Sequence, residues 1–420
     1  MTTAQSPTPE RIAADRAHCD IDISTERFWR QPFAAREEAF AALRARPGIT
    51  WHAPLDVPFP HEEKGFWAVT RHADIAHVST HHDLFCSGQG IGLGPIPVEF
   101  EQMMSFFLAM DPPEHTTYRR IIGAAFTPKQ VRKVDEVIAA NARDIVDAVV
   151  GAGEFDFVER VAALLPMHTV SDMVGVPRSE RDAVTEAAGS IIGADLDTSE
   201  EAITRMFENI QYLHSMGADL AEHRRKHPAD DLMTSIVQAE VDGQRLTNEQ
   251  IGAFMILLST AGNDTTKQTS AHVIKALADH PDQKAWLTED FDGRIKQSIE
   301  EFVRYATPVM DFARHATRDT VIGDQPIAQG EKVAIFYCSG NRDETVFAEP
   351  DRFDLTRWPN PHQGFGGGGI HYCLGHFVAK IQLRCLFSEL LTKLPDLEVG
   401  EPVYLSSNFV NGITSLPVRA

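Results

Sequence analysis

Apolar residues recur every three or four positions through the middle of the chain, which is the spacing of amphipathic helices. Residues 133–152 and 200–227 show this pattern most clearly. Runs typical of strands are fewer and lie toward the two ends of the sequence. The pattern predicts one domain over residues 1–420, mainly α with a small β subdomain. Its strands are expected at about 45–75, at about 315–340 and in a C-terminal hairpin, 404–418.

The turn of that hairpin has its own signal. Asn411 and Gly412 stand between two apolar arms, Asn408–Val410 and Ile413–Val418. An Asn-Gly pair between such arms favours a two-residue hairpin turn. We therefore expect the chain to reverse at these two residues.

Composition and charge narrow the class of protein. The 420 residues are 43% apolar and 24% charged, and the formal net charge is −21. Nucleic acids and anionic membranes attract positive surfaces, so neither is the expected partner. The N-terminus has no apolar core, and the most apolar stretch, residues 251–262, is too short to cross a bilayer. A monomeric cytoplasmic protein without a membrane anchor is predicted.

Five cysteines are scattered along the chain without a C-x-x-C pair. Zinc ribbons and iron–sulfur clusters need grouped thiolates, so both are unexpected here. Four of the cysteines are interpreted as small buried apolar residues, the usual role of a free cysteine. Cys373 differs because of its neighbours.

Cys373 lies in the segment FGGGGIHYCLG, residues 365–375. An apolar helical pattern follows, so the thiol precedes a helix N-terminus, where the helix dipole and free N–H groups stabilise a thiolate. Four adjacent glycines let a backbone turn tightly against something flat. A phosphate-binding loop would need Lys and Ser or Thr after its last glycine, and these are missing. A single thiolate on a glycine-lined loop suits axial ligation of a haem iron.

The segment HQGFGGGGIHYCLG, residues 362–375, resembles the haem-binding loop of the cytochrome P-450 (haem-thiolate) monooxygenases. The resemblance extends in order over nearly the whole chain. It implies the cytochrome P-450 fold, with haem b between a long distal helix and the proximal helix after the loop. Cys373 would be the iron ligand, with Phe365 and Gly375 beside the cofactor. One departure is that Phe365 lies eight residues before the cysteine, where most members have seven.

A second motif is AGNDTT, residues 261–266, inside a helical pattern from about 249 to 279. These residues are poor choices for a helix interior, yet the preceding residues are apolar all round, which indicates a buried helix. A polar surface face is the alternative for this stretch alone. The resemblance implies that Asp264 and Thr265 deliver the two protons that dioxygen activation consumes. Ala261 and Gly262 would leave room for dioxygen, the co-substrate.

Charged residues in three other segments complete the resemblance. The E-x-x-R pair Glu301 and Arg304 is weak evidence alone, because exposed pairs are common. The resemblance joins them with Arg357 in a buried triad that braces the cysteine loop. It also assigns four cationic groups to the haem propionates: His115, Arg119, Arg314 and His371.

The substrate side is predicted from apolar residues that the resemblance places above the haem, although plain core packing explains them equally. They are Met103, Phe106, Phe107, Ile256, Leu257, Val309, Phe312, Phe409 and Val410. Asp311 is the exception among them, interpreted either as an anchor for a substrate hydroxyl or amine or as an acceptor for backbone amides. A terpenoid-, steroid- or branched aliphatic-like molecule is expected.

The predicted function is haem-thiolate monooxygenation of an apolar small molecule. The chain has no flavin domain or cluster motif, so its two electrons are expected from a ferredoxin and a ferredoxin reductase. Cations between residues 119 and 133, with Lys380 and Arg384, are predicted to form the docking patch. Two alternatives are a peroxide-driven peroxygenase and a non-catalytic haem sensor or accessory homologue.

Overall fold

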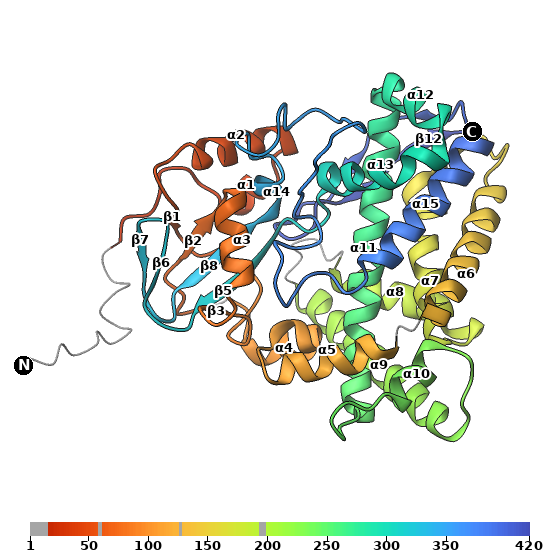
Figure 1. Cartoon of the computed structure of the whole chain (residues 1–420), viewed down its shortest axis with the longest axis horizontal. Coiled ribbons are helices and arrows are strands. Elements are labelled where there is room, and N and C mark those ends of the chain that lie inside the picture. Colours follow the sequence, from red (N-terminus) through yellow and green to blue (C-terminus); the bar gives the residue numbers. More distant parts are fainter. Residues whose placement is uncertain (1–15, 58–60, 126–127, 193–198) are drawn as a thin grey trace, which may run out of the picture.

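The computed structural model describes residues 16–57, 61–125, 128–192 and 199–420. Helices and a β region lie at opposite sides of the molecule, with α11 running through the helical side (Figure 1). The α-helices are α1 (Glu26–Trp29), α2 (Phe33–Arg44), α3 (His72–Thr80), α4 (Val98–Ser105), α5 (Glu114–Ala125), α6 (Pro128–Asp147), α7 (Leu164–Val174), α8 (Arg181–Ile192), α9 (Glu200–Lys226), α10 (Leu232–Gln238), α11 (Asn248–Asp279), α12 (Pro281–Glu289), α13 (Phe291–Ala306), α14 (Tyr337–Gly340) and α15 (His376–Lys393). Short turns of other helix types are η2 (Phe106–Ala109), η3 (Val158–Ala162) and η4 (Arg178–Glu180).

The strands are short, and the largest sheet holds five of them. They are β1 (Thr50–His52), β2 (Phe66–Val69), β3 (Phe85–Cys86), β4 (Glu154–Asp156), β5 (Asp311–Ala316), β6 (Thr320–Ile322), β7 (Gln325–Ile327), β8 (Lys332–Phe336), β9 (Glu398–Val399), β10 (Val403–Tyr404), β11 (Ile413–Ser415) and β12 (Pro417–Arg419). The main sheet has the order β1-β2-β8-β5-β3. The prediction of a mainly α protein with a small β portion is confirmed.

The two faces of this sheet have different neighbours, which matters for the site. Phe312 of β5 lies opposite Ile335 of β8, and Asp311 lies opposite Phe336. Ile335 packs with the residues of α3, whereas Phe336 packs with α1 and α2. Because successive side chains of a strand point to opposite faces, Phe312 and Asp311 leave the sheet in opposite directions.

The Asn-Gly turn prediction is wrong. β10 pairs with β11, but residues 405–412 form the connection, so Asn411 and Gly412 do not make a two-residue turn. The Asn411 side chain instead donates to the Ala306 carbonyl at 2.7 Å, and its backbone N–H donates to Pro308 at 3.0 Å. Tertiary hydrogen bonds to the end of α13 therefore outweigh the local turn preference.

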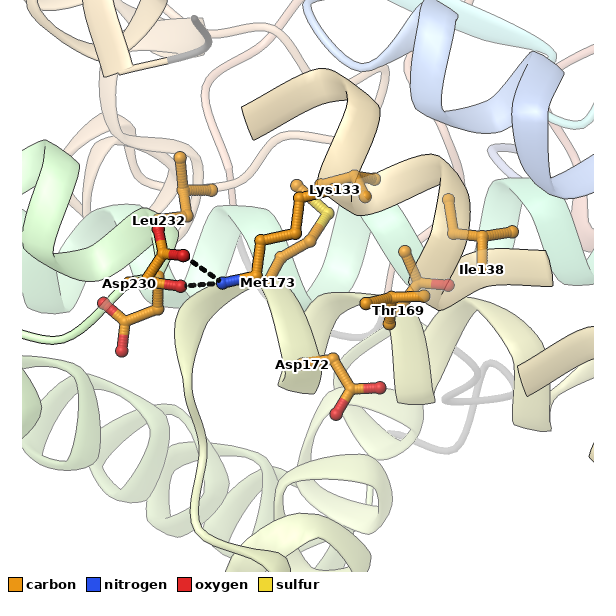
Figure 2. A pocket seen from close by; sticks show the side chains of 10 residues that line it. Lys133, Ile138, Thr169, Asp172, Met173, Asp230 and Leu232 are labelled. Atoms are coloured by element: carbon orange, nitrogen blue, oxygen red, sulfur yellow. Dashed lines mark hydrogen bonds and ion pairs between the residues drawn. The ribbon is translucent and has the colours of Figure 1, made fainter. Parts of the chain in front are cut away.

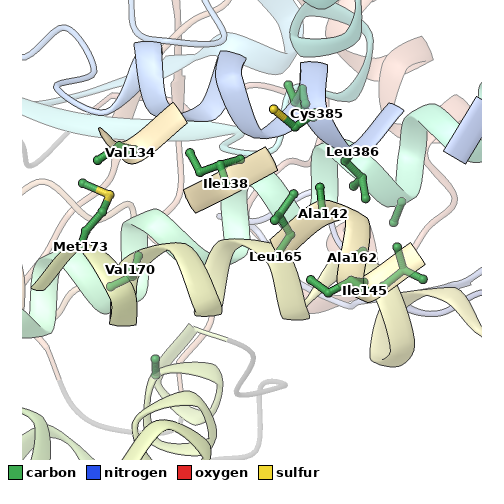
Figure 3. Close-up of a cluster of buried hydrophobic side chains, with 14 of the residues drawn as sticks. Val134, Ile138, Ala142, Ile145, Ala162, Leu165, Val170, Met173, Cys385 and Leu386 are labelled. Carbon is green, nitrogen blue, oxygen red and sulfur yellow. The ribbon is translucent and has the colours of Figure 1, made fainter. Parts of the chain in front are cut away.

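α6 and α7 pack against α15, and the three helices form one edge of the helical side. Figure 2 shows a pocket between α6, α7 and the start of α10, where the Lys133 ammonium reaches Asp230. Behind it, apolar side chains of α6, η3, α7 and α15 interdigitate, as Figure 3 shows for Ile138, Leu165 and Leu386. Burial of such faces is the main stabilising contribution to helices of this length.

The long helix α11 begins with a complete capping box, in which Thr247 and Gln250 satisfy each other's backbone N–H groups. It continues without interruption to Asp279, although its middle carries buried polar residues. Their hydroxyl groups donate to carbonyls one turn back, as Thr260 does to Ile256 at 2.9 Å. Thr260, Thr269 and Ser270 satisfy their hydroxyl groups in this way, whereas the buried Ser259 hydroxyl has no hydrogen-bond partner in the described residues.

Candidate functional site

The glycine run has a specific packing reason. Gly366, Gly368 and Gly369 have φ angles of +104°, +97° and +75°, which side-chain-bearing residues rarely adopt. A Cβ on Gly369 would lie 2.1 Å from the Ser79 carbonyl oxygen at the end of α3. The loop is thus pressed against α3. The Cys373 N–H closes it by donating to the Phe365 carbonyl at 2.9 Å, across the eight-residue spacing.

Cys373 stands three residues before α15 and is partly exposed. Burial raises the pKa of its thiol, while the Gly375 N–H, the charge of Arg119 and the His376 N–H lower it. Burial is the largest of these causes, so the pKa of the thiol lies above its ordinary value, and the two N–H donors and the charge of Arg119 limit the rise. The other cysteines are buried or packed elsewhere, and none of the five forms a disulfide in the described residues.

Phe365 and Gly375 lie on either side of the cysteine in the loop, and their place beside the cofactor stays a prediction. The Phe365 ring is 91% buried, lies 6.1 Å from the His376 ring, and has the Lys380 ammonium 5.2 Å above it. Gly375 is exposed and caps α15. The proximal side of the loop is therefore a packed aromatic and cationic surface.

Two guanidinium groups and two imidazoles converge beside this loop. The His115 and His371 rings are 4.3 Å apart, and the Arg119 guanidinium donates to the Tyr372 carbonyl. Arg314 is buried on β5, and its guanidinium lowers the pKa of both histidines. Burial is the larger cause and brings the pKa of His115 to about 4 and that of His371 to about 2. The structure thus brings together all four predicted residues.

This cluster fits a group with two carboxylates. In the described part of the chain, no carboxylate forms an ion pair with Arg119 or Arg314, and both ring nitrogens of His115 lack a hydrogen-bond partner. Buried cations without a counter-ion are costly. The haem propionates would supply that counter-charge, and the Cys373 thiolate would supply the axial ligand.

One line of residues along α11, called the open line below, is partly exposed. Leu257, Ala261 and Thr265 follow one another at four-residue spacing, and Ala261 is exposed although it lies mid-helix. The Thr265 hydroxyl donates to the Ala261 carbonyl at 2.9 Å. Ile256 is completely buried on the neighbouring line, with Thr260, so it is removed from the predicted substrate face.

Gly262 has a different use from the predicted one. A Cβ at this position would lie 3.1 Å from a methyl group of Val170 on α7. The missing side chain therefore allows α7 and α11 to approach closely. We correct the prediction that Gly262 makes room for dioxygen; Ala261, on the open line, keeps that role as a prediction.

Asp264 is 97% buried and forms an ion pair with Lys267, one turn along α11. Burial raises the pKa of its carboxyl, and the adjacent ammonium lowers it. The sequence analysis did not single out Lys267. The sequence feature that could have identified it is a lysine three residues after an acid on a helix predicted to be buried.

Glu301, Arg304 and Arg357 form the predicted buried triad. Arg304 donates to both Glu301 oxygens at 2.7 Å, and the Arg357 Nε lies 3.2 Å from the same carboxylate. Arg304 also donates to three backbone carbonyls, and Asn360 donates to Glu301 at 3.0 Å. Asn360 lies in the segment that leads to Cys373, so the triad ties α13 to the cysteine loop.

The predicted substrate residues fall into two groups. Val309 bridges Val410, and the Phe312 and Phe409 rings lie 5.3 Å apart. Phe106 and Phe107 are buried beneath the start of α5, with Phe107 5.8 Å from the His115 ring. Met103 is 39% exposed. The structure brings together the segments on β5 and at the C-terminus.

Asp311 does not join them, so both interpretations of this residue are corrected. It lies on the opposite sheet face from Phe312, toward α1 and α2, and is completely buried. Neither of its oxygens accepts a hydrogen bond, which excludes the backbone-amide interpretation in this structure. Burial raises the pKa of this carboxyl well above its ordinary value, and Lys332 lowers it only in part.

Ser87 is another residue that the sequence analysis missed. Its hydroxyl lies 3.0 Å from the His371 Nε2, and its backbone N–H donates to Asp111 at 2.8 Å. Ser87 therefore holds one edge of the cationic cluster. No local motif marks it, because its partner is 284 positions away in the sequence.

Comparison with known proteins agrees with this geometry. The family model described as Cytochrome P-450 matches residues 190–395. The methyl-branched lipid omega-hydroxylase of Mycobacterium tuberculosis strain H37Rv is 36% identical over 420 residues, covering 98% of this chain and 96% of that protein. The steroid C26-monooxygenase of Rhodococcus jostii strain RHA1 is 35% identical, covering 95% and 83%.

A solved structure is similar over nearly the full length. Mycobacterium marinum cytochrome P-450 CYP268A2 in complex with pseudoionone has a TM-score of 0.92 and 49% identity, covering 96% of this chain and 99% of that one. The chain belongs to the cytochrome P-450 family. It has the cytochrome P-450 fold and is a haem-iron monooxygenase that uses dioxygen, a redox partner and apolar substrates. Within the described ranges, no helix combines the length and hydropathy needed to span a membrane.

Proposed function

We propose that this protein holds haem b through Cys373 and hydroxylates a branched apolar molecule. One observation supports this most strongly: the glycine loop holds a single thiol near Arg119, and beside the loop both ring nitrogens of the buried His115 lack a hydrogen-bond partner. His115, Arg119, Arg314 and His371 would hold the propionates. Bound haem supplies dioxygen activation and transfer of one oxygen atom into a C–H bond.

The chain's own contribution to that reaction is proton delivery and positioning. Thr265 holds a hydroxyl on the open line, where it can donate to a bound oxygen or water. Asp264, one residue earlier, is the buried acid that passes protons to it. Two protons are needed for each turnover, since the second oxygen atom leaves as water.

The proposed substrate is a terpenoid-, steroid- or branched aliphatic-like molecule. The relatives named above as a methyl-branched lipid omega-hydroxylase and a steroid C26-monooxygenase support this class, as does the pseudoionone complex. Leu257, Val309, Phe312 and Phe409 are partly exposed apolar side chains that would contact it. Phe106, Phe107 and Val410 support them from behind.

A ferredoxin and its reductase are the proposed electron donors, with a monomer in the cytoplasm as the acting form. The predicted docking patch needs revision. Lys133 lies 3.1 Å from Asp230, Lys380 2.6 Å from Glu300, and Arg384 2.5 Å from Asp135. Arg120 likewise pairs with Asp242 at 2.8 Å. Each of these cations is neutralised locally, so the surface steers a partner less strongly than isolated cations would.

One experiment separates this proposal from its two alternatives. Purified holoenzyme is supplied with a branched fatty acid or a steroid, and product is measured with ferredoxin, reductase and NADPH or with hydrogen peroxide alone. We expect product that depends on NADPH and is lost in Asp264→Asn. Turnover with peroxide alone, unaffected by Asp264→Asn, would favour a peroxygenase. Tight haem binding without product or substrate-induced spin shift would favour a sensor.

A further inference from the structure

Lys267 is a charged residue that the reaction described above does not use. Its ammonium contacts Oδ1 of Asp264, and the two side chains are 17% and 4% exposed. The Asp264 carboxylate is therefore almost completely buried, whereas the side chain of Lys267, which pairs with it, is partly exposed. A cation in this position lowers the pKa of the Asp264 carboxyl.

The two residues lie on a different side of α11 from Thr265. Asp264 and Lys267 are three positions apart and so are neighbours on the helix surface. Thr265 lies with Ala261, to whose carbonyl its hydroxyl donates. Successive residues of a helix are rotated by about 100°. Asp264 and Thr265 are thus adjacent in sequence, but the ion pair with Lys267 keeps the Asp264 carboxylate on a different side of α11 from Thr265.

No other charged group among the described residues acts appreciably on Asp264. The helix α7 packs against this part of α11, but its charged groups, His168 and Asp172, interact with Arg181 and Asp182 on α8. Burial raises the pKa of Asp264, and Lys267 opposes this by its charge and a hydrogen bond. Without Lys267, burial alone would determine the pKa of Asp264.

We propose that Lys267 is the positioning residue of the proton relay, which keeps the buried Asp264 carboxyl ionised between turnovers and on its side of α11. The proposal rests on the function proposed above. In each transfer, a proton from solvent forms an O–H bond at Asp264 and then leaves toward the Thr265 hydroxyl. The carboxylate is thereby restored beside Lys267, which keeps its own proton throughout. No electron is transferred in this step.

The physical reason is that a buried carboxyl without a counter-ion retains its proton too strongly. A proton donor works best when its pKa lies near the working pH. Burial raises the pKa of Asp264 and the adjacent Lys267 ammonium lowers it, so the ion pair decides how far the pKa of this carboxyl rises. Lys267 therefore changes how readily Asp264 releases a proton, without touching the substrate.

The first test is infrared titration of the ferric holoenzyme, which needs no turnover. The carbonyl band of the protonated Asp264 carboxyl is followed against pH, with Asp264→Asn as the blank. We expect the band to persist to higher pH in Lys267→Met than in wild type, while Lys267→Arg follows wild type. Lys275→Met is the matched control, because Lys275 is also 17% exposed on α11 and pairs with Asp279 at 2.6 Å.

The second test measures product and hydrogen peroxide per NADPH. We expect Lys267→Met to lose about three- to tenfold in product per NADPH, since the carboxyl remains, whereas a complete proton-transfer group contributes roughly 10²–10⁴-fold. Lys267→Arg should restore coupling, and Lys267→Met should add nothing in an Asp264→Asn background. Lys267→Gln replaces the methionine variant if that variant binds no haem.

The results that would overturn the proposal are distinct from failure of the proposed function. If Lys267→Met titrates like wild type, or if Lys275→Met loses coupling equally, Lys267 is not the positioning residue. If wild type makes no product but the infrared band shifts as expected, the function is wrong and the assignment of the ion pair stands.

Discussion

Thr265 carries the clearest single-residue prediction. Thr265→Ala removes the hydroxyl on the open line of α11 but leaves the helix and its neighbours in place. We expect haem and substrate to bind normally while product per NADPH falls by at least about tenfold and hydrogen peroxide rises.

Thr269→Ala is the matched control for that variant. Thr269 lies one turn further along α11, and its hydroxyl donates to the Thr265 carbonyl at 2.8 Å in the same manner. NADPH, peroxide and product are measured together in both variants. Equal coupling in Thr265→Ala and wild type would remove this hydroxyl from proton delivery.

Asp311 gives a prediction about stability and pH. Burial raises its pKa, so the folded protein keeps a proton that the unfolded chain loses above pH about 4. The carboxyl's contribution to stability is therefore fully present below that pH and is lost as pH rises toward the raised value. Asp311→Asn should become increasingly stable relative to wild type as pH increases.

Denaturant unfolding of the two proteins at several values between pH 4.5 and 8 measures this difference. Asp324→Asn is the control, because Asp324 is exposed in the β6–β7 turn. A difference between Asp311→Asn and wild type that does not change with pH would mean that Asp311 is paired or hydrated in solution.

At the scale of elements, the triad on α13 sets the stability of the cysteine loop. Glu301→Ala leaves Arg304 and Arg357 as buried cations without their carboxylate, which costs roughly 3–5 kcal/mol. We expect little folded, haem-loaded protein. Yield, haem content and the unfolding midpoint are compared with those of Glu289→Ala, which removes the exposed partner of Arg294 at the end of α12. A stable Glu301→Ala holoprotein would show that the triad does not brace the loop.

How well the sequence predicts these elements depends on how far apart in the sequence the contacting residues lie. The cysteine loop and the long helix are local patterns, and both were predicted. The reason for the glycine run was not, because it lies in Ser79, 290 positions before Gly369. The sheet face on which the Asp311 side chain lies could not be predicted either, because it depends on which face packs on α1 and α2. At Asn411, hydrogen bonds to α13 replaced the expected turn.

At the scale of the whole molecule, the distribution of charge is more informative than its total. The net charge of −21 gives no sign that Arg119 and Arg314 gather with two histidines beside the cysteine loop. These groups come from α5, β5 and the cysteine loop, which only the fold brings together. Four cations proposed for partner docking instead pair with nearby carboxylates: Arg120, Lys133, Lys380 and Arg384. The haem-site residues thus stay a prediction from family resemblance, and the ion pairs of the docking cations could not be predicted from the sequence.

The central claim is that Cys373 binds the haem iron as a thiolate. The most direct measurement is the absorption spectrum of the reduced carbon monoxide complex of wild type and Cys373→Ser, with Cys385→Ser as a control for a cysteine buried in the core. We predict the strongly red-shifted Soret band of a haem thiolate in wild type and Cys385→Ser, and its absence in Cys373→Ser. A Cys373→Ser protein that retains this band would contradict the account.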